Sequence, residues 1–149
     1  MINLAKHNLK DIYINLQQGN IKKTTYQDNS FDLITSTGSF YLWNHPEESL
    51  DEIYRILKPN RHVLLFNSHK EYNQEELKNS LTKNLQNENF FTKRMVPLFL
   101  KKQIKMTYNI KAVEDVIKNS IFGDNYSLNK ITLANLPIWL KFDLKKMTP

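Results

Sequence analysis

The chain contains no cysteine and only three glycines among its 149 residues. The lack of cysteine excludes disulfides, thiol nucleophiles, iron–sulfur clusters and cysteine-ligated zinc. Gly19, Gly38 and Gly123 lie far apart, which excludes a glycine-rich phosphate or dinucleotide loop. No apolar run approaches the roughly 20 residues of a membrane-spanning helix. The first residues also lack the apolar centre of a signal peptide, so we expect a cytoplasmic protein.

The composition that is present, 40% hydrophobic and 24% charged residues, is typical of a globular protein of one domain. The net charge of +6 comes from residues 73–149, which carry 13 basic and 7 acidic side chains. Because 18 of the 21 cations are lysine, they lack the bidentate contacts that arginine makes with bases and phosphates. A basic RNA-binding module is therefore the weakest of three functional hypotheses, since no RNA-recognition motif accompanies the charge.

Hydrophobic patterning predicts an α/β protein in which strands and helices alternate. In the first half, Pro46 opens a helix whose apolar residues form one stripe, and Pro59 stops it. The second half begins with leucines that recur every four residues, and it ends in two strands whose short connection includes Pro137. The expected elements are a helix end at 4–9, a strand at 11–16, a strand of buried type at 31–35, a helix at 46–57, a second strand of buried type at 62–66, a helix at 77–85, an apolar basic segment at 90–106 broken by Pro97, a helix around 113–117 and strands at 126–134 and 138–144.

Three segments of this pattern, in fixed order, resemble the central block of the S-adenosylmethionine-dependent methyltransferases. They are Gly-Asn-Ile at 19–21, Asp-Asn-Ser-Phe-Asp-Leu-Ile at 28–34 and Leu-Asp-Glu-Ile-Tyr-Arg-Ile-Leu-Lys-Pro at 50–59. The subgroup that they resemble is type 11, which includes the ubiquinone and menaquinone methyltransferases. The resemblance implies a partial Rossmann-like methyltransferase sheet that lacks the first two strands and ends in an antiparallel hairpin. It divides residues 1–149 into a central motif block (1–68), a variable cover segment (69–111) and a terminal helix and hairpin (112–149).

The resemblance implies S-adenosyl-L-methionine as the cofactor and places its adenine at Gly19, Asn20 and Ile21. The family usually has aspartate where Asn20 stands, but the Asn20 amide oxygen can still accept a hydrogen bond from the adenine amino group. An ordinary Gly-Asn turn is the alternative interpretation of this loop. Thr37 and Gly38 correspond to residues that face the methionine part of the cofactor.

By the same resemblance, Tyr41 and Trp43 line the substrate side, where aromatic faces suit a sulfonium cation. Packing against the following helix is the alternative role for these aromatic residues. His45 could deprotonate an acceptor, but its place beside Pro46 favours a helix cap. Methyl transfer depends on in-line alignment, so the catalytic residues stay unknown. His62 and His69 have poor metal-ligand spacing, and we expect no metal site.

The chain departs from the family in two places. Lys-Pro-Asn-Arg at 58–61 stands where Lys-Pro-Gly-Gly is typical, and Asn60 tolerates the left-handed conformation better than Arg61. The family's first strand with its glycine-rich loop, and its second strand with the acidic residue that binds the ribose, have no counterpart. We therefore expect the carboxyl-terminal portion of a methyltransferase, inactive unless a separate polypeptide supplies the amino-terminal half. A non-catalytic methyltransferase-like binding or regulatory protein is the second hypothesis.

The missing strands also bear on the folded state. We expect the ordered core at residues 31–68 with the final hairpin, and the strand at 11–16 displaced or paired in a new way.

The methyl acceptor is expected to be a small molecule, because the tetrapeptide of DNA amino-methyltransferases is absent after residues 31–35. Residues 90–106 combine aromatic, aliphatic and basic side chains, which suits a hydrophobic acceptor or docking on an anionic membrane surface. The alternative is a cover helix that buries its apolar face on the sheet and leaves its lysines in solvent.

Overall fold

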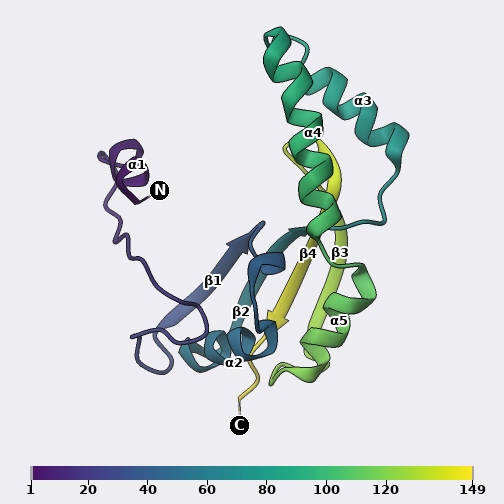
Figure 1. Cartoon of the computed structure of the whole chain (residues 1–149). Helices are drawn as coiled ribbons and strands as arrows, with labels where there is room; N and C mark the ends of the chain where they lie inside the picture. Colours follow the sequence, from purple (N-terminus) through teal and green to yellow (C-terminus); the bar gives the residue numbers. More distant parts are fainter. Residues whose placement is uncertain (1, 149) are drawn as a thin grey trace.

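The computed structural model describes residues 2–148 and shows one open sheet with helices against it (Figure 1). Within these residues, every helix is too short or too polar to cross a bilayer. The elements are α1 (Ile2–Asn8), β1 (Phe31–Thr37), a 3₁₀ turn η1 (Phe40–Leu42), α2 (Pro46–Ile56), β2 (Leu57–Ser68), α3 (Gln74–Asn84), α4 (Phe90–Met106), α5 (Ile110–Asn119), β3 (Tyr126–Leu133) and β4 (Leu136–Lys145).

The sheet has the strand order β1-β2-β4-β3, with β1 parallel to β2 and the other two pairs antiparallel. This order confirms the expected partial sheet with its terminal hairpin. The β1–β2 register shifts at Phe31, which pairs with Leu57, whereas Leu33 pairs with His62. The extra residues of β2 are accommodated at Asn60, whose φ is +58°. Asparagine is one of the few side chains that adopt this conformation readily, as predicted.

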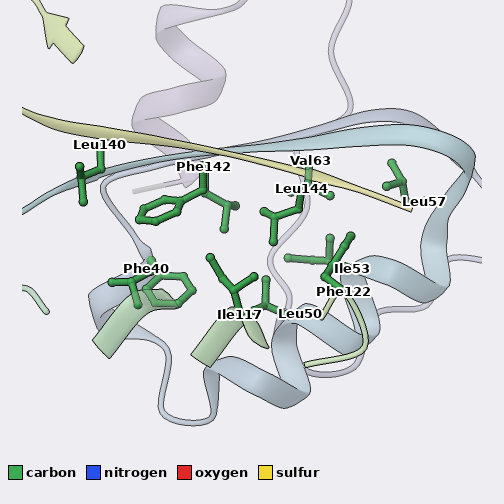
Figure 2. Close-up of a cluster of buried hydrophobic side chains, with 12 residues drawn as sticks. Phe40, Leu50, Ile53, Leu57, Val63, Ile117, Phe122, Leu140, Phe142 and Leu144 are labelled. Carbon is green, nitrogen blue, oxygen red and sulfur yellow. The ribbon is translucent and has the colours of Figure 1, made fainter. Parts of the chain in front are cut away.

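The core lies on one face of the sheet, between β2 and β4 above and α2 and α5 below (Figure 2). Because side chains alternate along a strand, Val63 and Leu65 of β2 and Phe142 and Leu144 of β4 point to the same side. The helices contribute Leu50, Ile53, Val113 and Ile117, all buried. The expected core of residues 31–68 and the hairpin is therefore present, and α5 completes it.

The predicted strand at residues 11–16 is wrong. This segment is irregular, and its side chains Ile12, Tyr13 and Ile14 are exposed. The segment runs apart from the sheet, beside the open edge of the molecule (Figure 1). Alternation alone cannot make a strand, since a strand needs a neighbour to satisfy its backbone hydrogen bonds.

Three other expectations need correction. β1 is not a buried strand: it forms the edge of the sheet, and Leu33 is 52% exposed. α4 runs unbroken through Pro97, although residue 97 has no N–H to donate to the carbonyl of Lys93. The hairpin turn contains only Ala134 and Asn135. β4 already begins at Leu136, which pairs with Leu133 of β3, so Pro137 lies within the strand rather than in the turn.

Candidate functional site

A pocket of about 520 Å³ lies between the loop that precedes β1 and the segment that follows η1. It unites Gly19, Asn20 and Ile21 with Trp43, four of the residues predicted for the cofactor and substrate sides. Sequence reasoning missed the other lining residues, which are Lys22, Leu42, Asn44 and Ser49. Lys22, Leu42 and Asn44 adjoin predicted residues in the sequence, whereas Ser49 has no such signal.

The loop at Asn20 is a tight polar turn. The Asn20 Oδ1 atom accepts the backbone N–H of Lys22 at 3.0 Å, and its carbonyl accepts the N–H of Lys23 at 3.1 Å. The Lys22 ammonium then reaches Glu48 of α2 at 2.8 Å, and this bond lowers the pKa of the Glu48 carboxyl. Both interpretations of the Gly-Asn sequence are therefore compatible: the turn is real, and Asn20 retains one acceptor lone pair for a ligand.

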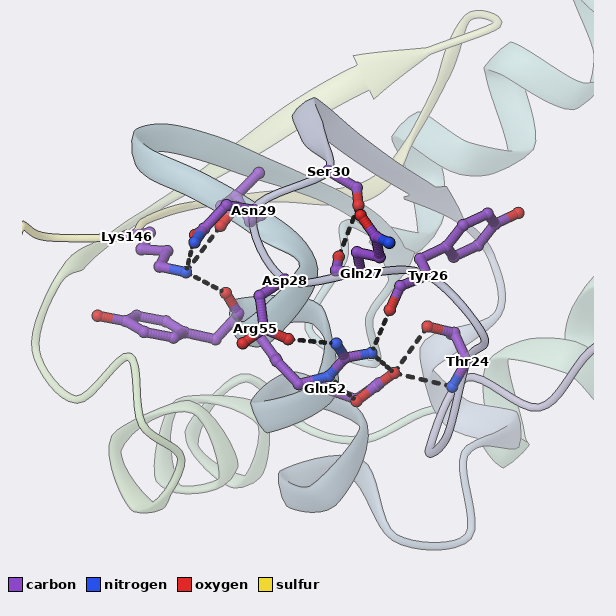
Figure 3. A network of polar contacts seen from close by, with 11 residues as sticks. Thr24, Tyr26, Gln27, Asp28, Asn29, Ser30, Glu52, Arg55 and Lys146 are labelled. Carbon is purple, nitrogen blue, oxygen red and sulfur yellow. Dashed lines mark hydrogen bonds and ion pairs between the residues drawn. The ribbon is translucent and has the colours of Figure 1, made fainter.

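A polar network holds the rest of the loop on α2 (Figure 3). Glu52 accepts the backbone N–H and the hydroxyl of Thr24 at 2.8 and 2.7 Å, and Arg55 bonds to Glu52, Asp28 and the carbonyl of Tyr26. The Arg55 guanidinium, helped by Thr24, overcomes burial and lowers the pKa of Glu52 to about 2. Because this network fixes residues 24–28, it also fixes the loop that enters the pocket.

Thr37 and Gly38 do not line this pocket. Gly38 follows β1 with a φ of +64°, and its N–H donates a hydrogen bond to the carbonyl of Phe66 at 2.7 Å. A Cβ at Gly38 would lie 3.8 Å from Trp139 Cη2 and 4.0 Å from Gln103 Nε2. This position therefore faces β4 and α4, and a positive φ explains why glycine stands there.

Two predicted substrate-side residues, Tyr41 and His45, also lie outside the pocket lining. His45 occupies the N-cap position of α2 without a side-chain capping hydrogen bond, and its Nδ1 lies 3.4 Å from Glu48. Both of these side chains are 58% exposed. Trp43 packs on Phe40 of η1 with ring centroids 5.0 Å apart, and it also lines the pocket at Asn20.

The carboxyl end of β2 holds a second group of polar side chains, which the sequence did not reveal. Asn67 and His69 are buried, and each uses one atom: Asn67 Oδ1 accepts the N–H of Phe40, and His69 Nδ1 accepts that of Glu71. Burial lowers the pKa of His69, and the nearby Lys130 charge adds to this. Because Nδ1 accepts a hydrogen bond, the neutral ring carries its proton on Nε2. Within residues 2–148, Asn67 Nδ2, His69 Nε2 and Trp139 Nε1 have no hydrogen-bond partner. Ligands of open α/β sheets bind off this end of the strands.

The pocket at Asn20 fits one end of S-adenosylmethionine. Its apolar side chains, Ile21, Leu42 and Trp43, suit a flat ring, and Asn20 and Asn44 offer amide groups to the ring edge. No acidic side chain lines the described pocket, so a ribose finds no carboxylate there. The residues present therefore fit the adenine and leave the remainder of the cofactor without partners in this pocket.

Comparison with known proteins bears on the fold. The model of the family described as "Methyltransferase domain" (type 11) matches residues 1–65, which include the Asn20 loop, β1 and α2. The chain has the methyltransferase fold. No curated protein sequence is significantly similar to it.

Solved structures extend the methyltransferase likeness over the whole chain. A SAM-dependent methyltransferase from Aquifex aeolicus superposes with a TM-score of 0.62 at 12% identity, over 96% of this chain and 62% of its own. A putative S-adenosyl-L-methionine-dependent methyltransferase from Methanococcus maripaludis superposes with a TM-score of 0.62 at 23% identity, over 99% of this chain and 60% of its own. A putative type 11 methyltransferase from Sulfolobus solfataricus superposes with a TM-score of 0.56 at 15% identity, over 99% of this chain and 68% of its own. The chain thus spans about three fifths of the length of the first two structures.

Proposed function

We propose that this chain forms the adenine-binding side of an S-adenosylmethionine-dependent methyltransferase that acts on a small-molecule acceptor. The observation that carries the proposal is the coincidence of two independent features. The family match covers residues 1–65, and the loop at Gly19–Ile21 within it lines a pocket together with Trp43.

In this proposal, each pocket residue has a defined task. Asn20 Oδ1 accepts a hydrogen bond from the adenine amino group with the lone pair that Lys22 leaves open. Ile21 and Trp43 bury the two faces of the ring and exclude water from it. When bound, the cofactor supplies an electrophilic methyl group, and the chain contributes position rather than acid–base catalysis.

We further propose that residues 1–149 on their own bind the cofactor weakly and are inactive. β1 is an edge strand, and its Asp32, Leu33, Thr35 and Thr37 side chains are exposed. A separate polypeptide that pairs with this edge would bring further cofactor contacts next to the Asn20 pocket. The free edge and the carboxylate-free pocket both support this proposal.

The experiment titrates the purified chain with adenosine and with S-adenosylmethionine, and follows backbone amide NMR signals and calorimetric heat. Adenosine is expected to bind in the millimolar range and to shift the signals of Asn20, Ile21 and Trp43. The Asn20→Ala variant should bind adenosine about fivefold more weakly, which is equivalent to about 1 kcal/mol for one hydrogen bond. Asn15→Ala is the matched control, because Asn15 is exposed and lies outside the pocket.

Two outcomes contradict the proposals separately. Micromolar binding of S-adenosylmethionine would disprove weak binding by the isolated chain. Adenosine shifts that avoid the pocket, or an equal loss in both asparagine variants, would disprove the adenine assignment.

A further inference from the structure

The helices α3 and α4 form a hairpin that projects beyond the end of the sheet (Figure 1). A groove of about 870 Å³ runs between them, within the size range of small-molecule sites. It shares no lining residue with the Asn20 pocket, so it is a separate site.

The floor of the groove is apolar and firmly anchored. Leu77 and Ile104 are buried against Ile138 of β4, while Leu81 and Leu100 are half-buried around them. Leu77, Leu81 and Leu85 recur every four residues and extend over about 12 Å, from within α3 to its C-cap. This floor is elongated, which suits a chain-like apolar group better than a compact ring.

The rim of the groove is positively charged. Lys78 of α3 and Lys93 and Lys101 of α4 line it, and no aspartate or glutamate is among its lining residues. Within residues 2–148, none of these three lysines has a carboxylate within 4 Å. Three unpaired ammonium groups around an apolar floor complement a ligand with a negative head and an apolar tail.

The structure also overturns the interpretation of residues 90–106 as a cover helix that buries its apolar face on the sheet. Ile104 is the one buried side chain of α4, Met95 and Val96 are half-buried, and Pro97 and Leu100 line the groove. Phe90, Phe91, Leu98 and Phe99 are all more than half exposed. The hairpin is thus built to present apolar surface rather than to bury it.

We propose that the α3–α4 groove binds a single-chain amphiphile with a carboxylate head, such as a medium-chain fatty acid. The acyl chain lies along the leucines of α3, and the carboxylate interacts with the lysine rim. This inference does not rest on the proposed methyltransferase function, because it involves neither the Asn20 pocket nor the cofactor.

The test compares decanoate, which has both chain and charge, with 1-decanol, which lacks the charge, and butyrate, which lacks the chain. Calorimetry and NMR shift mapping on the purified chain give the affinity and the site. Decanoate is expected to bind best and to shift Leu77, Leu81, Leu100 and Ile104. The triple variant Lys78→Gln, Lys93→Gln, Lys101→Gln should weaken decanoate about tenfold and leave 1-decanol unchanged.

The matched control is the triple variant Lys83→Gln, Lys102→Gln, Lys105→Gln. It removes the same charge, one lysine from α3 and two from α4, at positions outside the groove lining. A control that loses as much affinity as the groove variant would overturn the proposal, because the attraction would then be non-specific. Equal binding of 1-decanol and decanoate would also overturn it.

Vesicles distinguish a free fatty acid from a membrane. If phosphatidylglycerol vesicles bind the chain and monomeric decanoate does not, the face is a membrane-docking surface and the proposal is wrong. If decanoate binds and shifts the groove signals without vesicles, the proposal is supported.

Discussion

Lys146 is a charged side chain that the fold buries to 8% exposure. Its ammonium donates hydrogen bonds to Asn29 Oδ1 and to the carbonyls of Tyr54 and Leu57, at 2.9, 2.8 and 2.7 Å. It also lies 4.8 Å from the centre of the Tyr54 ring. A cation at the carboxyl end of α2 satisfies carbonyls that the helix leaves free and complements the helix dipole.

Replacement of this residue tests its role. Lys146→Met should lower the free energy of unfolding by about 2 kcal/mol, because three acceptors lose a charged donor. Lys145→Met, at the exposed neighbour, should change it by less than about 0.5 kcal/mol. Urea denaturation followed by circular dichroism measures both values. Equal effects would mean that the buried contacts contribute nothing specific.

Glu52 makes the stability of the chain depend on pH. Its pKa is about 2 in the folded protein, against 4.5 for the free side chain, because Arg55 and Thr24 stabilise the carboxylate. A depressed folded pKa gives stability that is fully present above pH 4.5 and is lost as the pH falls toward 2. Arg55 is 34% exposed, so solvent screening limits the contribution to about 1–2 kcal/mol.

The corresponding variant is Glu52→Gln. At pH 7 it should be about 1–2 kcal/mol less stable than the parent chain, and the difference should shrink as the pH falls from 4.5 to 2. Urea unfolding at pH 7, 4 and 2.5 measures this convergence. A constant difference at all three pH values would show that the ionised carboxylate is not the cause.

At the scale of single elements, the β3–β4 hairpin contains a local strain. Ala134 and Asn135 have φ values of +50° and +57°, the conformation of a two-residue type I′ turn. Asparagine tolerates this conformation, whereas alanine is disfavoured there by about 1 kcal/mol. The turn persists because Asn84 of α3 bonds to the Ala134 carbonyl and accepts a hydrogen bond from Asn135.

Relief of this strain should stabilise the protein. Ala134→Gly is expected to raise the melting temperature by about 2–4 °C, which corresponds to about 1 kcal/mol for a chain of this size. Ala112→Gly, within α5, should act in the opposite direction, since glycine weakens a helix by about 0.5–1 kcal/mol. Differential scanning calorimetry compares the two. A lower melting temperature for both variants would place the positive φ of Ala134 in doubt.

At the scale of the whole molecule, the sheet has one covered and one open face. The strand register places Leu33, Leu64 and Phe66 on the face opposite the core, and none of them is fully buried. β1 also has no strand beyond it within residues 2–148. An unpaired edge with apolar side chains favours association between chains.

This arrangement predicts concentration-dependent self-association of the purified chain. Leu33→Lys should shift the population toward monomer, because an edge charge must be desolvated before another strand can pair with it. Lys23→Leu, the reverse exchange at an exposed residue outside the sheet, is the control and should leave the association unchanged. Sedimentation velocity at rising concentration decides the matter. A wild-type chain that stays monomeric at all concentrations would contradict the prediction.

Much of the fold and part of the site could be predicted from local sequence. The helix at Pro46, the strands around Val63 and the terminal hairpin follow from periodicity and turn residues, which are short-range properties. The loop at Asn20 was also predicted, and it does line a pocket. Tyr41 and Gly38 lie elsewhere because the backbone conformations of η1 and of the turn after β1 decide where these residues face. The polar group at Asn67 and His69 was missed because buried polar atoms are visible only once the strands are paired.

The sequence by itself determined the α/β class, the strand and helix types after residue 31 apart from the unbroken helix through Pro97, and the resemblance to methyltransferases. These depend on hydrophobic period, prolines and short motifs, and local interactions suffice for them. The tertiary structure alone decided that residues 11–16 form no strand, that β1 is an edge and that α3 and α4 enclose a lysine-rimmed groove. Each of these depends on whether a partner lies alongside, since backbone hydrogen bonds and apolar surface are satisfied only by neighbours distant in the chain.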